Sequence, residues 1–345
     1  HSVAPASVVT RAVACGGGAV CVRNHVRPSA ARREICRWPH NSRTHETPSS
    51  ATAVPVTAIG YNATGNTANL ALAFALPVGT NLTVVNNTGL GFISGTFGNL
   101  SQGQEVALPY NGTTYRFVAN YFGGTGNDLV LQWAATRLLA WGDNFSGQLG
   151  TGGTAYADRP AAVAVAGALA GKTILSTANG YDVSLAVCSD GTVASWGGNF
   201  AGQLGNGNTS NSSVPVVVNQ AGVLAGKKVV AVSAGYAHCV ALCSDGTLAA
   251  WGQNDGGKLG DGGYTSSSVP VAMNQAALSG KSVVAVSAGY SSSLALCSDV
   301  TVVSWGYPET GPVNTFGALS AKTVVSISAG NSSGFAVCSD GTAVG

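Results

Sequence analysis

The stretch 167–173 comes closer than other segments of this chain to a nucleotide-binding loop. It reads GALAGKT, with three residues between its glycines, whereas a phosphate-binding P-loop has four. Related Gly-Lys or Ala-Lys pairs return at 226–227, 280–281 and 321–322. A motif that returns at a regular interval belongs to a structural repeat, so we expect no nucleotide site here.

His238 stands beside Cys239, a combination that can activate a thiolate nucleophile. Adjacent residues of a strand point to opposite faces, so these two side chains cannot meet. The chain predicts no catalytic dyad at this position. His238 fits better as a structural residue of its strand.

Five cysteines and four aspartates of the second half also lack a chemical role. The cysteines, Cys239 and the regularly placed Cys188, Cys243, Cys297 and Cys338, read as small buried hydrophobes, because equivalent places in different repeats are too far apart for disulfides. The aspartates recur in Ser-Asp turns, where turn chemistry explains them, at positions 190, 245, 299 and 340. We therefore predict no catalytic residue, no metal site and no cofactor.

Trp-Gly pairs mark a repeat along this half of the chain. They fall at 141, 196, 251 and 305, with spacings of 55, 55 and 54 residues. In the unit 229–273, short apolar runs are separated by Asp-Gly and Gly-rich turns, which predicts four short antiparallel strands. Four such strands per unit is typical of a propeller blade.

The repeats resemble the regulator of chromosome condensation family of seven-bladed propellers. The likeness rests on GYAHCVALCSDGTLAAWG (235–252), on GQLG at 147–150 and 202–205, and on GKLG at 257–260. The resemblance implies an all-β fold in which residues 136–345 form a partial β-propeller of about four blades, truncated at the C-terminus. The chain departs from the pattern at Val300, which replaces a turn glycine, and at the missing loop after Trp305.

Residues 51–135 form a separate small β-rich, β-helix-like segment in this interpretation. The alternation in LALAFAL (70–76) and the run LTVV (82–85) predict strands, and Asn111-Gly112 predicts a type I′ hairpin turn. Pro109 places its strand at a sheet edge. The stretch 123–129 fits one copy of a calcium-binding nonapeptide, which supplies half a site, so we favour a turn. Residues 89–133 also resemble segments beside β-helical passenger repeats in bacterial surface proteins.

The first fifty residues differ in charge from the rest. They carry a balance of +5, whereas residues 51–345 carry −3, from nine basic and twelve acidic groups. We interpret residues 1–50 as a disordered or non-native leader, with a basic arm for an anionic partner as the alternative. Their cysteines, at 15, 21 and 36, lack a familiar zinc spacing.

These features favour a non-enzymatic protein, secreted or displayed on a bacterial cell surface, whose propeller binds a partner or has a structural role. The expected ligand is a protein or a surface glycan. The negative body argues against nucleic acid, and no apolar run is long enough to span a membrane. The candidate contact residues follow the Trp-Gly pairs and are Asn144, Phe145, Asn199, Phe200, Asn254 and Asp255.

Two alternatives stay open. The resemblance implies guanine-nucleotide exchange on a small GTPase, with chromatin binding. A propeller-type β-lactamase inhibitor is similar in fold, which makes enzyme inhibition the other alternative. Fold does not fix function in any of these cases.

Overall fold

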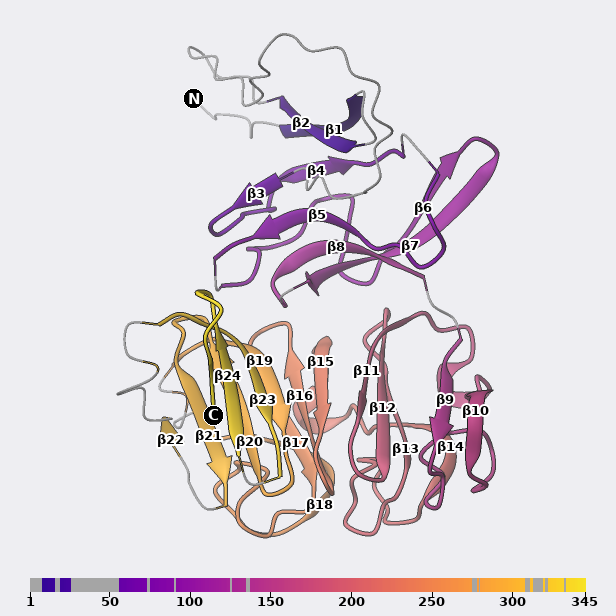
Figure 1. Ribbon diagram of the computed structural model, residues 1–345, viewed down its shortest axis with the longest axis vertical. Helices are drawn as coiled ribbons and strands as arrows, with labels where there is room; N and C mark the ends of the chain where they lie inside the picture. Colours follow the sequence, from indigo (N-terminus) through magenta and orange to yellow (C-terminus); the bar gives the residue numbers. More distant parts are fainter. Residues whose placement is uncertain are drawn as a thin grey trace.

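The computed structural model is an all-β molecule with a β-rich segment set over one end of a row of propeller sheets (Figure 1). The structure describes residues 8–15, 19–25, 56–72, 75–89, 91–124, 126–134, 137–274, 278, 280–307, 311–312, 319, 322–331 and 333–345.

The described residues of the first fifty form two strands. β1 (Val8–Cys15) and β2 (Ala19–His25) form an antiparallel pair, and β1 also runs parallel to β4 (Asn66–Asn69). Cys36, one of the three cysteines of the metal alternative, lies outside the described residues. The interpretation of residues 1–50 as a leader stays a prediction.

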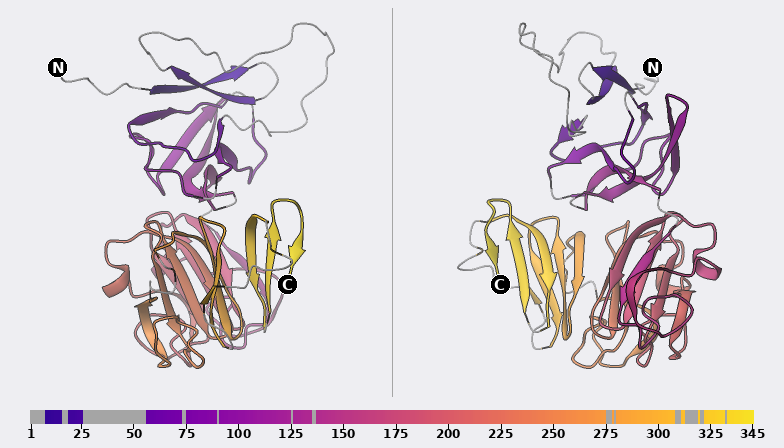
Figure 2. Two further views of the ribbon diagram at one scale, coloured as in Figure 1. Left: turned by 90° about the vertical axis from the view of Figure 1, so that its left-hand side faces the viewer. Right: turned by 45° about the vertical axis from the view of Figure 1, so that its right-hand side comes forward.

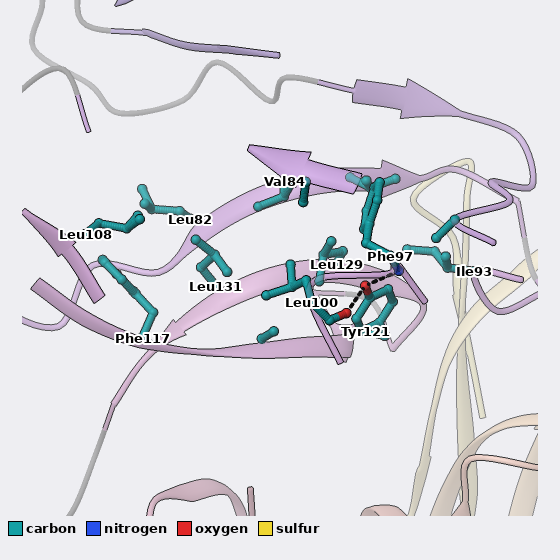
Figure 3. Close-up of a cluster of buried hydrophobic side chains, with 14 of the residues drawn as sticks. Leu82, Val84, Ile93, Phe97, Leu100, Leu108, Phe117, Tyr121, Leu129 and Leu131 are labelled. Atoms are coloured by element: carbon teal, nitrogen blue, oxygen red, sulfur yellow. Dashed lines mark hydrogen bonds between the residues drawn. The ribbon is translucent and has the colours of Figure 1, made fainter. Parts of the chain in front are cut away.

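The β-rich segment contains a five-stranded sheet in the order β3-β5-β8-β7-β6. Its core is shown in Figure 3, where the Tyr121 hydroxyl accepts a hydrogen bond from the Phe97 backbone N–H at 2.9 Å and donates one to the Leu100 carbonyl at 2.6 Å. These two bonds tie a loop to the sheet through a buried ring. The strands are β3 (Val56–Ala58), β5 (Leu82–Asn87), β6 (Glu105–Tyr110), β7 (Thr113–Gly123) and β8 (Asp128–Trp133).

The turn chemistry of this segment is confirmed. Asn111 and Gly112 join β6 to β7 with φ of 46° and 79°, the two positive values that a type I′ turn needs. β6, which contains Pro109, is an edge strand. In the turn 123–129, the Asp128 carboxylate accepts a hydrogen bond from the Asn87 backbone N–H at 2.8 Å.

The strand predicted over 70–76 is wrong for the residues that the structure describes there. β4 ends at Asn69, and residues 70–72 and 75–76 form no strand. The Asn99 side-chain oxygen accepts a hydrogen bond from the Ala68 N–H at 2.7 Å, and its Nδ2 donates one to the Ala68 carbonyl at 2.6 Å. A side chain thus bonds to Ala68 in the way that a neighbouring strand would. Leu72 and Leu76 are nevertheless buried, because the alternation still directs them inward.

The propeller part contains three four-stranded sheets, in the orders β11–β14, β15–β18 and β19–β22. A two-stranded sheet, β9–β10, precedes them, and a three-stranded sheet, β23–β25, follows. Sequential strands pair antiparallel, as predicted for blades. The strands are β9 (Leu139–Gly142), β10 (Ala157–Ala162), β11 (Ile174–Asn179), β12 (Val183–Cys188), β13 (Val193–Gly197), β14 (Ser212–Val217), β15 (Val229–Ala234), β16 (His238–Cys243), β17 (Leu248–Gly252), β18 (Ser267–Ala272), β19 (Val283–Ala288), β20 (Ser292–Cys297), β21 (Val302–Gly306), β22 (Gly311–Pro312), β23 (Val324–Ala329), β24 (Gly334–Cys338) and β25 (Ala343–Val344).

The tryptophan of each complete sheet is held by the G-x-L-G loop of the preceding unit. Each indole N–H donates to a carbonyl of that loop, which links neighbouring sheets through a buried side chain. The bonds join Trp196 to Gln148 and Trp251 to Gln203, both at 2.9 Å, and Trp305 to Lys258 at 2.8 Å. The same contact between neighbouring sheets therefore recurs with the repeat.

His238 and Cys239 contact opposite neighbours, as the strand geometry predicts. His238 Nε2 lies 2.8 Å from the Ser293 hydroxyl on the following sheet. The Cys239 thiol donates to the Gln203 carbonyl of the preceding unit, 3.4 Å away. Burial raises the pKa of the Cys239 thiol, so this cysteine stays protonated at neutral pH.

The recurring lysines explain the stretch that is close to a P-loop. Lys172 pairs with Asp190 and donates to the Thr192 hydroxyl, 3.0 Å away, so it anchors the Ser-Asp-Gly-Thr turn of its own sheet. The same arrangement links Lys227, Lys281 and Lys322 to Asp245, Asp299 and Asp340. The motif is therefore part of the repeat architecture, as expected.

Val300 occupies a strained turn position, which leads to a stability prediction. Its φ is 67°, whereas glycine stands at the equivalent places, for example Gly246 with φ of 79°. A β-branched residue in this left-handed region costs about 1–2 kcal/mol. We expect Val300→Gly to raise the free energy of unfolding by about 1 kcal/mol in a urea titration, and Gly246→Val to lower it by a similar amount. Equal or lower stability of Val300→Gly would contradict this reading.

Candidate binding face of the propeller

Each complete sheet has two ends, and the hydrogen-bond register assigns every loop to one of them. Val183 pairs with Gly197, so the loop between β11 and β12 and the loop after β13 lie together. We call this the open end. It comprises residues 180–182, 235–237 and 289–291 and the long loops 143–156, 198–211 and 253–266. The opposite, covered end carries the Ser-Asp-Gly-Thr turns.

The β-rich segment lies against the covered end (Figures 1 and 2). Gln132 Nε2 donates to the Leu175 carbonyl at 2.6 Å, and the Thr173 hydroxyl donates to the Glu105 carboxylate at 3.0 Å. Lys228 Nζ, from the next unit, donates to a backbone carbonyl of the segment at 3.2 Å. Figure 1 shows the other ends of the sheets pointing away from this segment. Within the described ranges, the β-rich segment thus leaves the open end uncovered.

A row of three tyrosines crosses the open end. Tyr236 lies between Tyr181 and Tyr290, with ring-centroid distances of 4.9 and 4.4 Å, and we call these three residues the tyrosine row. Phe200 joins it at 6.5 Å from Tyr236. Tyr181 is 74% exposed and Phe200 58%. Large, accessible aromatic rings in mutual contact are a common feature of binding surfaces.

Backbone hydrogen bonds between sheets set the spacing of the tyrosine row. The N–H of each tyrosine donates to the carbonyl of the glycine that precedes the corresponding position in the next sheet. The donors Tyr181, Tyr236 and Tyr290 reach Gly235, Gly289 and Gly330 at 3.2, 3.1 and 3.0 Å. The row is consequently held by the framework of the propeller rather than by the long loops.

Three of the six predicted contact residues lie inside their loops and not on the surface. The side chains of Asn144, Asn199 and Asn254 are fully buried, so they cannot touch a partner in this conformation. Each one holds its long loop together: the Asn199 amide accepts from the Leu204 N–H at 2.8 Å and donates to the Ser210 carbonyl at 2.9 Å. A buried amide satisfies several backbone groups that the loop would otherwise leave unpaired.

The other three predicted residues are accessible. Phe145 is 86% exposed, Phe200 adjoins the tyrosine row, and Asp255 lies at the surface of its loop. Their role in binding stays a prediction. The tyrosine row is not among the residues predicted from the sequence, although Gly-Tyr recurs at 180, 235 and 289.

Acidic groups outnumber basic ones at the open end. Among the residues that the structure describes there, the charged side chains are Lys258 and the aspartates at 143, 182, 255 and 261. Lys258 is already paired with Asp255 at 2.7 Å, and its Nζ lies 5.9 Å from the centre of the Tyr290 ring. Burial raises the pKa of the Asp182 carboxyl. The open end therefore suits a partner with positive charge.

The described part of the chain contains no group of three His, Cys, Asp or Glu residues arranged to hold a metal ion. Its helices include none that is long and apolar enough to cross a membrane.

A family model, "Regulator of chromosome condensation (RCC1) repeat", matches residues 190–242 and 245–296, and a second model of the same description matches residues 229–258. The chain carries regulator of chromosome condensation repeats. The matched region contains the whole sheet β15–β18 and parts of the sheets on either side, including the Trp251 contact between units and the central residue of the tyrosine row.

Proteins with these repeats include much longer chains. The human E3 ubiquitin-protein ligase HERC2 is 35% identical over 176 residues, which are 50% of this chain and 4% of HERC2. The Arabidopsis thaliana ultraviolet-B receptor UVR8 is 33% identical over 175 residues, 50% of this chain and 38% of the receptor. This chain thus spans less than half the length of these relatives.

Solved structures show the same fold for the repeats. Human WBSCR16 has a TM-score of 0.50 at 21% identity, over 67% of this chain and 57% of that protein. Prp20p from Saccharomyces cerevisiae has a TM-score of 0.50 at 24% identity, over 61% of this chain and 54% of Prp20p. The condensation repeats of this chain therefore form propeller blades, and the number of blades in its ring stays a prediction.

Proposed function

We propose that the propeller is a non-enzymatic protein-binding module and that the open end is its binding surface. The observation that carries this proposal is the tyrosine row at the end that the β-rich segment leaves uncovered. Tyrosine rings give a large, rigid contact area at low entropic cost, and neighbouring Ser, Gly and Asn residues adapt their hydrogen bonds to a partner. The loop 198–211, GNFAGQLGNGNTSN, has this composition.

A protein with the same fold supports a protein partner. Prp20p has binding properties to Gsp1p and histones, so a propeller of this fold can serve as a protein-binding surface. In this chain the framework fixes the tyrosine row, while the long loops vary between units and supply specificity.

We also propose that the protein is secreted or displayed on a bacterial cell surface. Nine basic residues in the 295 residues after position 50 and uncharged Asn/Ser/Thr/Gly loops support this location. The coding sequence on both sides of the chain tests it. A signal peptide upstream with an anchor downstream would support the proposal, and intracellular flanking domains would contradict it.

Selection from a random peptide display library tests the binding surface. We expect peptides selected on the whole chain to lose at least tenfold in affinity on Phe200→Ser or Tyr236→Ser. Val217→Ser is the matched control, because it changes an exposed apolar residue on the outer strand β14. Peptides that bind all three variants equally well, or that bind only the β-rich segment, would contradict the proposal.

Guanine-nucleotide exchange and enzyme inhibition remain the alternatives. Release of a labelled guanine nucleotide from small GTPases tests the first of them. Our proposal expects the release rate to be the same with and without this protein. Acceleration that Tyr236→Ser abolishes would make the open end an exchange surface instead. An inhibition assay with a β-lactamase tests the second alternative. Our proposal expects no inhibition, and inhibition that Tyr236→Ser abolishes would make the open end an inhibitory surface.

A further inference from the structure

One part of the open end places a buried carboxylate beside three aromatic rings. Tyr236 has the ring of Tyr181 at 4.9 Å and that of Phe200 at 6.5 Å, and Asp182 directly follows Tyr181 in the chain. Asp182 is 9% exposed. Its carboxylate also borders Gly198, because a Cβ at that position would overlap Asp182 Oδ2. The carboxylate therefore lies against the start of the loop that carries Phe200.

The Asp182 carboxylate has little compensation within the protein. It accepts hydrogen bonds from Gln203 Nε2, over a long 3.5 Å, and from its own backbone N–H, and no ion pair involves it within the part of the chain that the structure describes. The one described cation of the open end, Lys258, is held by Asp255 and by Gln253 Oε1, 3.1 Å away. A buried carboxylate of this kind gains when a cation from outside approaches it.

Blade packing does not require an acid at this position. The equivalent residues of the next two sheets are Ala237 and Ser291, and both sheets fold with the same register. Gly198 leaves room for the Asp182 carboxylate, because a Cβ at this position would collide with it. The equivalent residues of the next two sheets are Gln253 and Tyr307. The sheet β11–β14 thus combines an acid with the space that it needs, in a way that the following two sheets do not.

We propose that Tyr181, Phe200, Tyr236 and Asp182 form a recognition site for an arginine side chain of the protein partner. This inference rests on the proposed function, since it names the partner group that the open end recognises. A guanidinium is planar and weakly hydrated, so it stacks on an aromatic face while its N–H groups donate to a carboxylate. The acidic excess of the open end favours the approach of such a group.

Two blocked pentapeptides test the site. They are acetyl-Gly-Ser-Arg-Ser-Gly-amide and the same peptide with citrulline, which keeps the shape of arginine and removes its charge. In a backbone-amide NMR titration of the whole chain, we expect the arginine peptide to shift residues 180–182 and 198–203 and to bind at least tenfold more tightly than the citrulline peptide. Asp182→Asn removes that preference, and Phe200→Leu weakens arginine binding.

Asp158→Asn is the control, because it removes an equal charge from the outer strand β10 and is expected to leave both affinities unchanged. Equal affinity of the two peptides, shifts confined to the covered end, or no shifts at all would overturn the inference. Display-selected peptides that still depend on Phe200 but show no preference for arginine would overturn it too, while leaving the proposed function in place. Selected peptides that ignore the open end would remove both.

Discussion

Acidification from pH 6.5 to pH 5 is expected to lower the free energy of unfolding by about 2 kcal/mol through His238 alone. This imidazole is fully buried, its Nε2 contacts the Ser293 hydroxyl, and its Nδ1 has no hydrogen-bond partner among the residues that the structure describes. Burial, and then the charge of Lys258, lower the pKa of His238 to about 3, against a weaker opposing effect of Asp255.

The direction of the effect follows from proton uptake. Below pH 6.5 the unfolded chain protonates this histidine, whereas the folded chain does so only near pH 3. The stabilising contribution of a neutral His238 is therefore complete above pH 6.5 and is lost progressively as the pH falls towards 3. The slope approaches about 1.4 kcal/mol per pH unit, the value for one proton.

The turn aspartates act in a lower pH range. Burial by itself would raise the pKa of Asp190, Asp245 and Asp299, yet the hydrogen bonds from lysine and threonine outweigh it and lower the pKa of all three. The same hydrogen bonds lower the pKa of Asp340. Their contribution is present above the ordinary carboxyl pKa and is lost below it. The window from pH 6.5 to 5 consequently isolates His238 from these ion pairs.

Urea unfolding at pH 7, 6 and 5 measures the effect. We expect the stability of His238→Val, which carries the residue found at position 183, to change much less with pH than that of the unsubstituted chain. Ser293→Ala is the control, because it removes the hydrogen-bond partner and keeps the buried imidazole. Parallel pH profiles for His238→Val and the unsubstituted chain would show that His238 is not the acid-sensitive group.

Gly235→Ala is expected to cost about 2–4 kcal/mol, from steric overlap between neighbouring sheets at the open end and a disturbed hydrogen bond. Glycine is required here by close approach and not by a positive φ: an added Cβ would overlap the Gly289 carbonyl and lie 2.7 Å from His238 Cε1. The Gly235 carbonyl also accepts the Tyr181 N–H, so a shift of this backbone disturbs the tyrosine row.

Thermal unfolding checks this prediction. A loss of this size lowers Tm by roughly 5–10 °C for a propeller part of this length. Gly153→Ala is the matched control, since an added Cβ there meets no atom within 4 Å and its φ is not positive. A Gly235→Ala variant as stable as Gly153→Ala would mean that neighbouring sheets separate easily at this point.

The sequence by itself determined the repeat and most of its strands. Asp-Gly and Asn-Gly turns need positive φ at fixed positions, and apolar alternation sets which side of a strand is buried, so both are written in neighbouring residues. For the same reason, the opposite directions of His238 and Cys239 follow from their adjacency, and the condensation repeats were recognisable from their spacing. The failure at 70–76 shows the limit, because Asn99, which bonds to Ala68 near the end of β4, is distant in the chain.

Only the tertiary structure decided which groups share a surface. The tyrosine row joins residues from three units about 55 positions apart, and the covered end became visible only when Gln132 and Glu105 were placed against Leu175 and Thr173. Burial separated the loop asparagines from the exposed phenylalanines, although they are neighbours in the chain. Exposure and proximity arise from the packing of sheets against one another, and no local pattern encodes where a neighbouring sheet will lie.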